Sequence, residues 1–375
     1  MTSPVSWYRL PLSAILPEQP TYFTGSVLGP SAERALRAAY EQFGAPLATG
    51  PLVWDAQSRR AALNDALLQP ADDALRRSLA DSGGGLSRLL GGGSPKRATA
   101  YIAQTLQDAP EIIARIERWW TRVRAMEWRQ ATVLQIMEEL EPRAEDALLA
   151  QARVALSLAA ALHLQAGQIS TARAEMTAGI DDGLPQASYA TALHSLAASL
   201  QKADTSAAAD WQQWPASLRD PLDTFLASYG RWADLPLETA RPRWVDDPSA
   251  LLAALPELTR SAAPIDPAEA SRRRVAAAAG VSPQLKSGQR KQFDAAAAQV
   301  EQLTALLPQV HTAVVIVAAA ARYWVSGAAN EALADGRLLT ADEVFLLELE
   351  ELKQMMTGEW SNVEQVRPLV EARRQ

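Results

Sequence analysis

Hydrophobic and polar positions alternate along most of this chain with the period of an α-helix. Between Pro110 and Pro142 the sequence predicts one long helix, because proline suits a first helical turn and disrupts a helix interior. Apolar residues recur there at spacings of three and four, which places them on one helix face. They are Ile112, Ile116, Trp119, Val123, Met126, Val133, Met137 and Leu140.

The same pattern predicts helices over most of the remaining sequence. The predicted ranges are 145–167, 186–202, 207–229, 287–307 and 311–334. Short connections between long helices favour antiparallel neighbours in a bundle. Thr340 and Glu343, three residues apart, form a capping-box pattern at the start of another helix.

The first hundred residues are less regular. A helix is predicted over 29–44, with Ser31 as its N-terminal cap and Gly44 at its end. The short extended segment "PLVWD" and two glycine clusters follow. The clusters lack P-loop spacing, so we interpret them as turns, with an anion-contacting loop as the alternative.

The predicted fold class is therefore mainly α: a helical bundle with a small irregular, mixed N-terminal portion. We divide the chain into four parts that form one continuous domain. They are the N-terminal portion (1–109), a helical bundle (110–230), a connecting loop rich in proline and tryptophan (231–265) and the C-terminal helices (266–375).

Composition narrows the class of protein. Of the 375 residues, 48% are hydrophobic and 21% charged, as in a soluble globular protein with a sizeable core. A net charge of −7 argues against nucleic acid or an anionic membrane as partner. The absence of cysteine excludes disulfides, thiolate catalysis and Cys-ligated zinc.

Location follows from the apolar segments. The first residues lack the basic segment and apolar core of a signal peptide. The most apolar run, 312–321, has ten residues, whereas a membrane-spanning helix needs about 20. We predict a buried helix there, no membrane span, and a cytoplasmic protein.

Candidate chemistry is sparse. The three histidines lie far apart, and none has a metal-ligand partner four residues on, so we predict no metal site and no cofactor. Trp119 and Trp120 lie together in a predicted helix. Such aromatic residues form core packing or line a pocket for a flat or apolar ligand, and both interpretations stay open.

Three segments resemble the phosphoenolpyruvate synthase-like phosphotransferases, especially their rifampin phosphotransferase branch. Segment 225–255 matches a pattern of Phe-Leu, Tyr-Gly and Pro-Arg-Trp at Phe225, Leu226, Tyr229, Gly230, Pro242, Arg243, Trp244, Asp247 and Pro248. Segment 333–358 is similar at Gly336, Leu338, Glu343, Val344, Phe345, Leu346, Glu351 and Leu352. Segment 52–68 is similar to the start of the family's middle domain.

Family enzymes combine an ATP-grasp module, a helical middle domain and a swivelling phosphohistidine module, and this chain resembles only the middle domain. The resemblance implies a stand-alone, non-catalytic homologue. It would be a substrate-holding or scaffolding subunit with separate ATP-grasp and phosphohistidine proteins as partners. Two alternatives remain: a protein that binds a hydrophobic small molecule, and a structural subunit of a larger assembly.

The chain departs from the family pattern where charge matters. The family's His-Arg pair after Tyr-Gly is replaced by Arg231 and Trp232, and the expected glutamate falls at Pro236 with Glu238 nearby. Phosphoryl transfer depends on positioning and charge stabilisation, so we expect no catalytic residues. The candidate ligand or interface residues are Arg231, Trp232, Glu238, Arg243, Trp244, Trp119, Trp120 and Arg322.

Overall fold

A computed structural model of the chain describes residues 16–45, 47–80, 94–169, 174–180, 186–201, 211–360 and 362–374. The predicted fold class is confirmed, since most of these residues are helical. The helices are α1 (Tyr22–Phe43), α2 (Asp65–Ala80), α3 (Ser94–Ala125), α4 (Gln130–Ala166), α5 (Ala187–Leu200), α6 (Ala216–Tyr229), α7 (Ser249–Leu258), α8 (Pro267–Val281), α9 (Ser287–Ala334), α10 (Leu349–Thr357) and α11 (Arg367–Arg374).

Short elements complete the fold. Strands β1 (Trp54–Asp55) and β2 (Arg60–Ala61) pair antiparallel as a small hairpin. A 3₁₀ helix, η7 (Ala341–Leu346), carries the predicted capping box of Thr340 and Glu343. The two glycine clusters and residues 1–15, where no signal peptide was predicted, lie outside the described residues.

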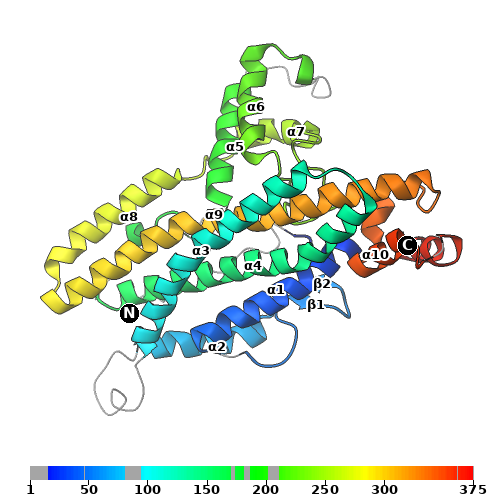
Figure 1. Cartoon of the computed structure of the whole chain (residues 1–375). Coiled ribbons are helices and arrows are strands. Elements are labelled where there is room, and N and C mark those ends of the chain that lie inside the picture. Colours follow the sequence, from blue (N-terminus) through cyan, green and yellow to red (C-terminus); the bar gives the residue numbers. More distant parts are fainter. Residues whose placement is uncertain are drawn as a thin grey trace.

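Helices α4 and α9 form the centre of the molecule and pack against each other along much of their length (Figure 1). The run Ala313–Ala321 of α9 is buried on every side, which confirms the buried helix predicted there. Most of its side chains are small, so neighbouring backbones can approach closely. The remaining helices are arranged around this pair.

Different helices pack on the different sides of the α4–α9 pair. Helices α1 and α3 pack on α4, and α3 also contacts α9. Helices α5, α6 and α7 form a small group that rises from one side, while α1, α2 and the hairpin lie on the other (Figure 1). The connecting segment 230–248 lies between α6 and α7 in the sequence.

The boundaries predicted from proline were wrong. Pro110 lies inside α3 and Pro142 inside α4. Pro308 lies inside α9, where two separate helices were predicted. Packing among α3, α4 and α9 outweighs the backbone hydrogen bond that each proline removes. The break falls instead between Ala125 and Gln130, where the chain leaves the helix.

Helix α1 starts earlier than predicted. It begins at Tyr22, and Thr21 rather than Ser31 is its N-terminal cap, through its side-chain oxygen and the Thr24 amide. Ser31 lies inside the helix and donates from its hydroxyl to the Val27 carbonyl. The predicted end at Gly44 is confirmed, with φ 97°, a left-handed conformation that glycine adopts without strain.

One buried polar pair joins the central helices. The Gln151 side-chain nitrogen lies 3.2 Å from Nδ1 of His311, which is fully buried. An amide nitrogen only donates, so Nδ1 accepts and the neutral imidazole carries its proton on Nε2. Burial lowers the pKa of His311 to about 4. The core therefore holds this imidazole in its neutral form.

By length and composition, α4 and α9 are apolar enough to cross a membrane. However, 72% of the apolar window in each helix is buried inside the protein. Core helices of soluble proteins have this property, and the burial supports the prediction that neither helix spans a membrane. The cytoplasmic location stays a prediction.

The buried imidazole predicts a pH dependence of stability. Because the folded pKa of His311, about 4, lies below its ordinary value of 6.5, the unfolded chain binds more protons between these values. The free energy of unfolding should therefore be fully retained above pH 6.5 and fall as the pH drops toward 4. This residue should account for about 3 kcal/mol of the fall.

Urea unfolding across this pH range measures the effect. The variant His311→Gln removes the titrating group and should flatten that part of the profile relative to the wild type. His194→Gln, which removes an imidazole bonded to Ser261 outside the core, is the matched control. Parallel profiles for His311→Gln and the wild type would contradict the prediction.

Candidate functional site

The connecting segment uses its carboxylate to hold α1. Glu238 is buried, and its two side-chain oxygens accept hydrogen bonds from the backbone and hydroxyl of Thr21 (3.0 and 2.8 Å) and the hydroxyl of Thr24 (2.6 Å). The Ala240 amide donates to the same carboxylate at 3.0 Å. Glu238 is therefore committed to fixing the start of α1 rather than free to contact a ligand.

Two arginines hold the same segment through its carbonyl oxygens. Arg243 is buried and donates to the Pro236 carbonyl at 2.7 Å. Burial, reinforced by nearby Arg322, lowers the pKa of Arg243 to about 9. Arg322 donates to the carbonyls of Thr239 and Ala240, at 3.0 and 2.8 Å. These guanidinium groups replace water as partners of the loop backbone.

The tryptophans of this segment lie in the core. Trp232 stacks on Tyr189 with ring centroids 4.4 Å apart and meets His311 edge to face at 5.4 Å. Trp244 is buried, and its indole nitrogen donates to the Tyr189 hydroxyl at 3.1 Å. Both rings thus fasten the segment to α5 and α9.

The remaining candidate residues differ in how deeply they are buried. Trp119 is buried, and its indole nitrogen donates to Glu139 at 2.6 Å. Trp120 and Arg231 are only partly buried, and both lie near Arg124 on α3. Of the predicted site residues, the structure brings these two to a common part of the surface, leaves Arg322 partly buried and buries the others.

An apolar cavity lies elsewhere, between α1, α4 and the hairpin. Its volume is about 140 Å³, and it is partly open to solvent. An apolar cavity of about 150 Å³ can hold a benzene-sized molecule. Its lining residues are almost all apolar: Leu16, Pro20, Thr24, Gly25, Leu28, Gly29, Ala32, Leu36, Tyr40, Val53, Trp54, Ala61, Leu63, Leu68, Leu148, Gln151, Ala152, Ala155, Leu156 and Leu237.

Trp54 of β1 forms one wall of this pocket by lying flat on α1. A Cβ atom placed on Gly25 would come 2.6 Å from the Trp54 ring, and one on Gly29 2.5 Å. The two glycines are four residues apart and therefore share one helix face. Only glycine at both positions leaves room for the indole against the helix backbone.

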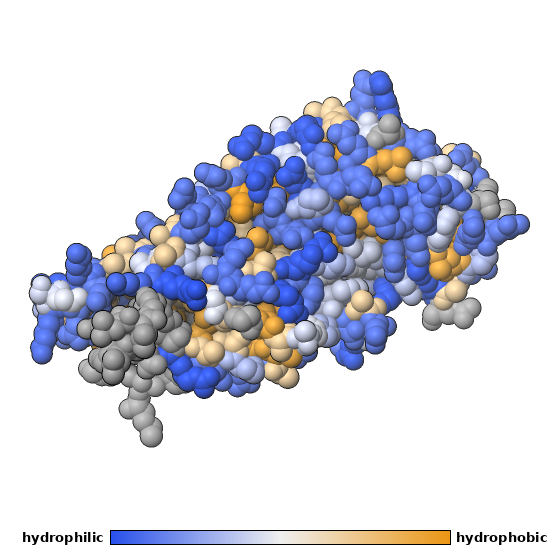
Figure 2. Space-filling model, turned by 60° about the horizontal axis from the view of Figure 1, so that its bottom comes forward, coloured by the Kyte–Doolittle hydropathy of each residue, from blue (hydrophilic) through white to orange (hydrophobic). Residues whose placement is uncertain are grey.

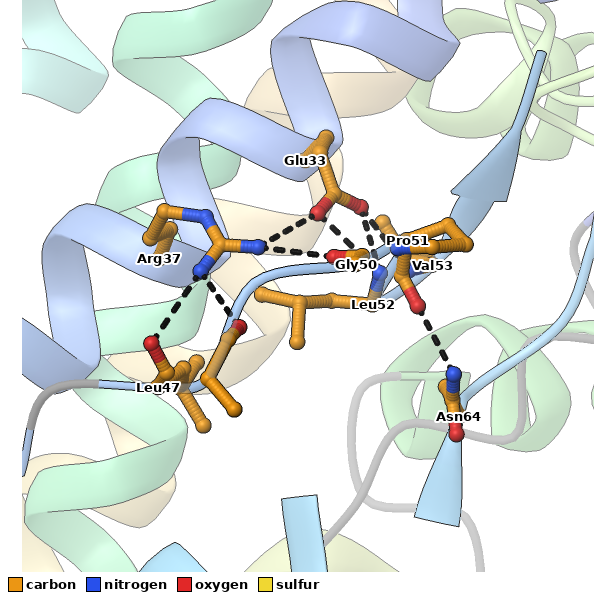
Figure 3. Close-up of polar contacts among 9 residues, drawn as sticks. Glu33, Arg37, Leu47, Gly50, Pro51, Leu52, Val53 and Asn64 are labelled. Carbon is orange, nitrogen blue, oxygen red and sulfur yellow. Dashed lines mark hydrogen bonds and ion pairs between the residues drawn. The ribbon is translucent and has the colours of Figure 1, made fainter. Parts of the chain in front are cut away.

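The segment that leads into β1 is clamped to α1 by a charged pair (Figure 3). Glu33 accepts hydrogen bonds from the backbone amides of Leu52 and Val53, at 2.8 and 3.0 Å. Arg37 donates to the carbonyls of Ala48 and Gly50 and to Glu33. The wall that carries Trp54 is thus fixed at both its amides and its carbonyls.

Most polar groups of the pocket are bonded within the protein, but the side-chain oxygen of Gln151 is buried without a hydrogen-bond partner among the described residues. The Tyr40 hydroxyl donates a hydrogen bond to Asp72 at 2.5 Å, and the Thr24 hydroxyl donates one to Glu238. Gln151 bonds to His311. Apolar residues also gather near the middle of the face shown in Figure 2, the side that carries α1 and α2. This arrangement suits binding of an apolar molecule rather than acid–base chemistry.

Metal binding has no support in the described part of the chain. No group of three or more His, Asp or Glu side chains there could hold a metal ion. The predicted absence of cofactors is not tested by the structure.

Sequence reasoning missed this pocket, although one signal was available. Gly25 and Gly29 lie at helical spacing, and Trp54 follows in the extended segment "PLVWD". The predicted helix began too late to include Gly25, so the flat glycine face was not recognised. The site also depends on contacts between α1 and α4, which no local pattern specifies.

The fold is mainly α-helical, and an apolar cavity lies between α1, α4 and the hairpin. Residues 155–316 match the family model of the rifampicin phosphotransferase fourth domain. This segment is therefore similar to a helical domain of rifampicin phosphotransferases, and the predicted resemblance is confirmed over residues 155–316. No curated protein matches the chain.

The matched segment covers only part of the pocket. It runs from α4 into α9 and includes Ala155, Leu156 and Leu237 of the lining. The wall made by α1 and the hairpin precedes it. The family resemblance thus accounts for the central helices and the connecting segment, while the pocket adds features from outside the match.

Substituting Gly29 tests the pocket wall. Helix propensity alone would favour alanine by about 1 kcal/mol, but the added methyl must displace the Trp54 ring. We expect Gly29→Ala to lower the free energy of unfolding by about 1–3 kcal/mol, as in other overpacked sites. Urea unfolding provides the measurement.

Gly288→Ala is the matched control, because a Cβ atom at this position of α9 would meet nothing within 4 Å. It should be neutral or stabilising. A Gly29→Ala protein as stable as the Gly288→Ala protein would show that Trp54 does not depend on the glycine face.

Proposed function

We propose that this chain is a non-catalytic, substrate-holding relative of the rifampicin phosphotransferase helical domain, and that it binds a small apolar molecule. The observation that carries the proposal is the pocket between α1, α4 and the hairpin, with its almost wholly apolar lining. Burial of apolar surface contributes roughly 25 cal/mol per Å², so such a pocket favours hydrophobic ligands.

The internal use of charged side chains supports the non-catalytic part of the proposal. Glu238, Arg243 and Arg322 each bind groups of the protein itself. Transfer of a phosphoryl group requires charged groups that face the substrate. These three side chains are instead occupied in holding the fold together.

Separate ATP-grasp and phosphohistidine proteins would act on the bound molecule in this proposal. The family resemblance alone implies these partners. Affinity purification of the tagged chain from its native cells, followed by mass spectrometry, tests this part. The proposal expects an ATP-grasp or histidine-carrier protein in the complex, and recovery of neither would remove the split-enzyme role while leaving ligand binding intact.

Ligand binding has its own test. Toluene and 1-hexanol should bind with a stoichiometry of one in calorimetric titrations, whereas glucose should not. The variant Ala152→Phe places a ring in the pocket from α4 and should weaken binding at least tenfold, because it fills the space that the ligand occupies.

Ala305→Phe is the control, since Ala305 lies exposed on α9. It adds the same ring away from the pocket and should bind like the wild type. Thermal unfolding of both variants establishes that they are folded. Equal affinities for Ala152→Phe and the wild type would show that the apolar molecules bind somewhere else.

A further inference from the structure

A second feature lies at the surface where α3, α9 and the start of the connecting segment meet. We call it the aromatic–arginine surface, and it consists of Trp120, Arg124, Trp128, Arg231 and Tyr323. Trp128 is 41% exposed and Tyr323 51%, which is unusual for such large apolar rings. Large aromatic residues exposed together commonly mark an interaction site.

The exposed rings are held rigidly. Trp128 stacks on buried Trp324 with centroids 5.2 Å apart, and a Cβ atom on Gly327 would come 2.0 Å from its ring. Tyr323 meets Trp120 edge to face at 6.5 Å. Trp128 lies in the break between α3 and α4, and its ring packs against Trp324 and Gly327 of α9. Exposed rings that are already ordered lose little entropy on binding.

Two positive charges border these rings, and neither forms an ion pair within the described part of the chain. The Arg124 guanidinium lies 5.3 Å above the Trp120 ring. Among the described residues, neither Arg124 nor Arg231 has a carboxylate within the 4.0 Å of an ion pair. Nε of Arg231 is buried and has no hydrogen-bond partner in the same part of the chain.

The surroundings of Arg231 disfavour its charge. Burial, together with Arg124, lowers the pKa of Arg231, while Glu117 partly opposes this effect. A negative group placed between the two guanidinium groups would relieve their repulsion and supply the missing hydrogen-bond acceptors. Two neighbouring cations without ion-pair partners among the described residues also contrast with the net charge of −7 of the whole chain.

We propose that the aromatic–arginine surface docks an acidic segment of a partner protein, with carboxylates on Arg124 and Arg231 and an aromatic side chain against Trp128 and Tyr323. Tryptophan, tyrosine and arginine are the residues that dominate protein–protein hot spots. The half-exposed rings fit a macromolecular partner better than a small molecule, since small-molecule sites are concave and enclose most of their ligand.

This surface shares no residue with the apolar pocket. The docking proposal therefore stands or falls separately from the ligand-binding function. A protein that binds toluene but no acidic polypeptide would retain the first property and lose the second.

A random copolymer of glutamate and tyrosine serves as the probe, and its binding to the full chain is followed by fluorescence anisotropy of a labelled polymer. We expect saturable binding that weakens with added salt, and weaker binding of polyglutamate without tyrosine. Arg124→Gln, Arg231→Gln and Trp128→Ala should each weaken binding at least fivefold. Arg231→Lys, which keeps the charge, should recover part of the loss.

Arg118→Gln is the matched control, because Arg118 is exposed on the same helix outside this surface. It should bind like the wild type. Exposed Arg124 tests the proposal even if a change at Arg231 disturbs folding. The proposal would be overturned if the copolymer did not bind, or if the three variants bound it with unchanged affinity. It would also be overturned if one molecule of phenyl phosphate per chain displaced the copolymer completely, because the site would then be one for a small molecule.

Discussion

The enclosure of α9 is the constraint on which the rest of this structure depends. The run Ala313–Ala321 is apolar on all sides, so it must be surrounded by other protein elements. Helices α3 and α4, with η7, provide much of that enclosure. His311, two residues earlier, is the polar exception: burial keeps its imidazole neutral, and Gln151 of α4 bonds to one ring nitrogen. The remaining elements are arranged by this requirement.

Charged side chains hold the connecting segment against the helices that enclose α9. Arg322 follows directly after the buried run and bonds to the backbone of this segment, while Arg243 and Glu238 bond within the segment and to α1. A buried carboxylate or guanidinium is stable only when its hydrogen-bonding groups are used. These side chains therefore link α1, α9 and the segment between α6 and α7, which explains charged residues in an otherwise apolar interior without reference to catalysis.

Local pattern predicted the fold class and the burial of the 312–321 run, because helical periodicity reflects one face packed on a core. It failed at Pro110, Pro142 and Pro308, where packing between distant helices outweighs a local disruption. It identified Glu238 and Arg243 as notable but could not show that their partners are internal. The pocket escaped prediction because its walls come from α1, α4 and the hairpin, whose proximity is a property of the tertiary structure.

The glycine face of α1 has a consequence for cooperativity. Glycine costs a helix up to about 1 kcal/mol per residue, so Gly25 and Gly29, followed by Pro30, leave the first half of α1 weak in isolation. Its helical state depends on Trp54 lying against it, and Trp54 in turn depends on the clamp from the second half of the same helix. This half-helix and the hairpin therefore open and close as one unit of local unfolding. A molecule in the pocket would stabilise that unit, making hydrogen exchange there a direct measure of occupancy.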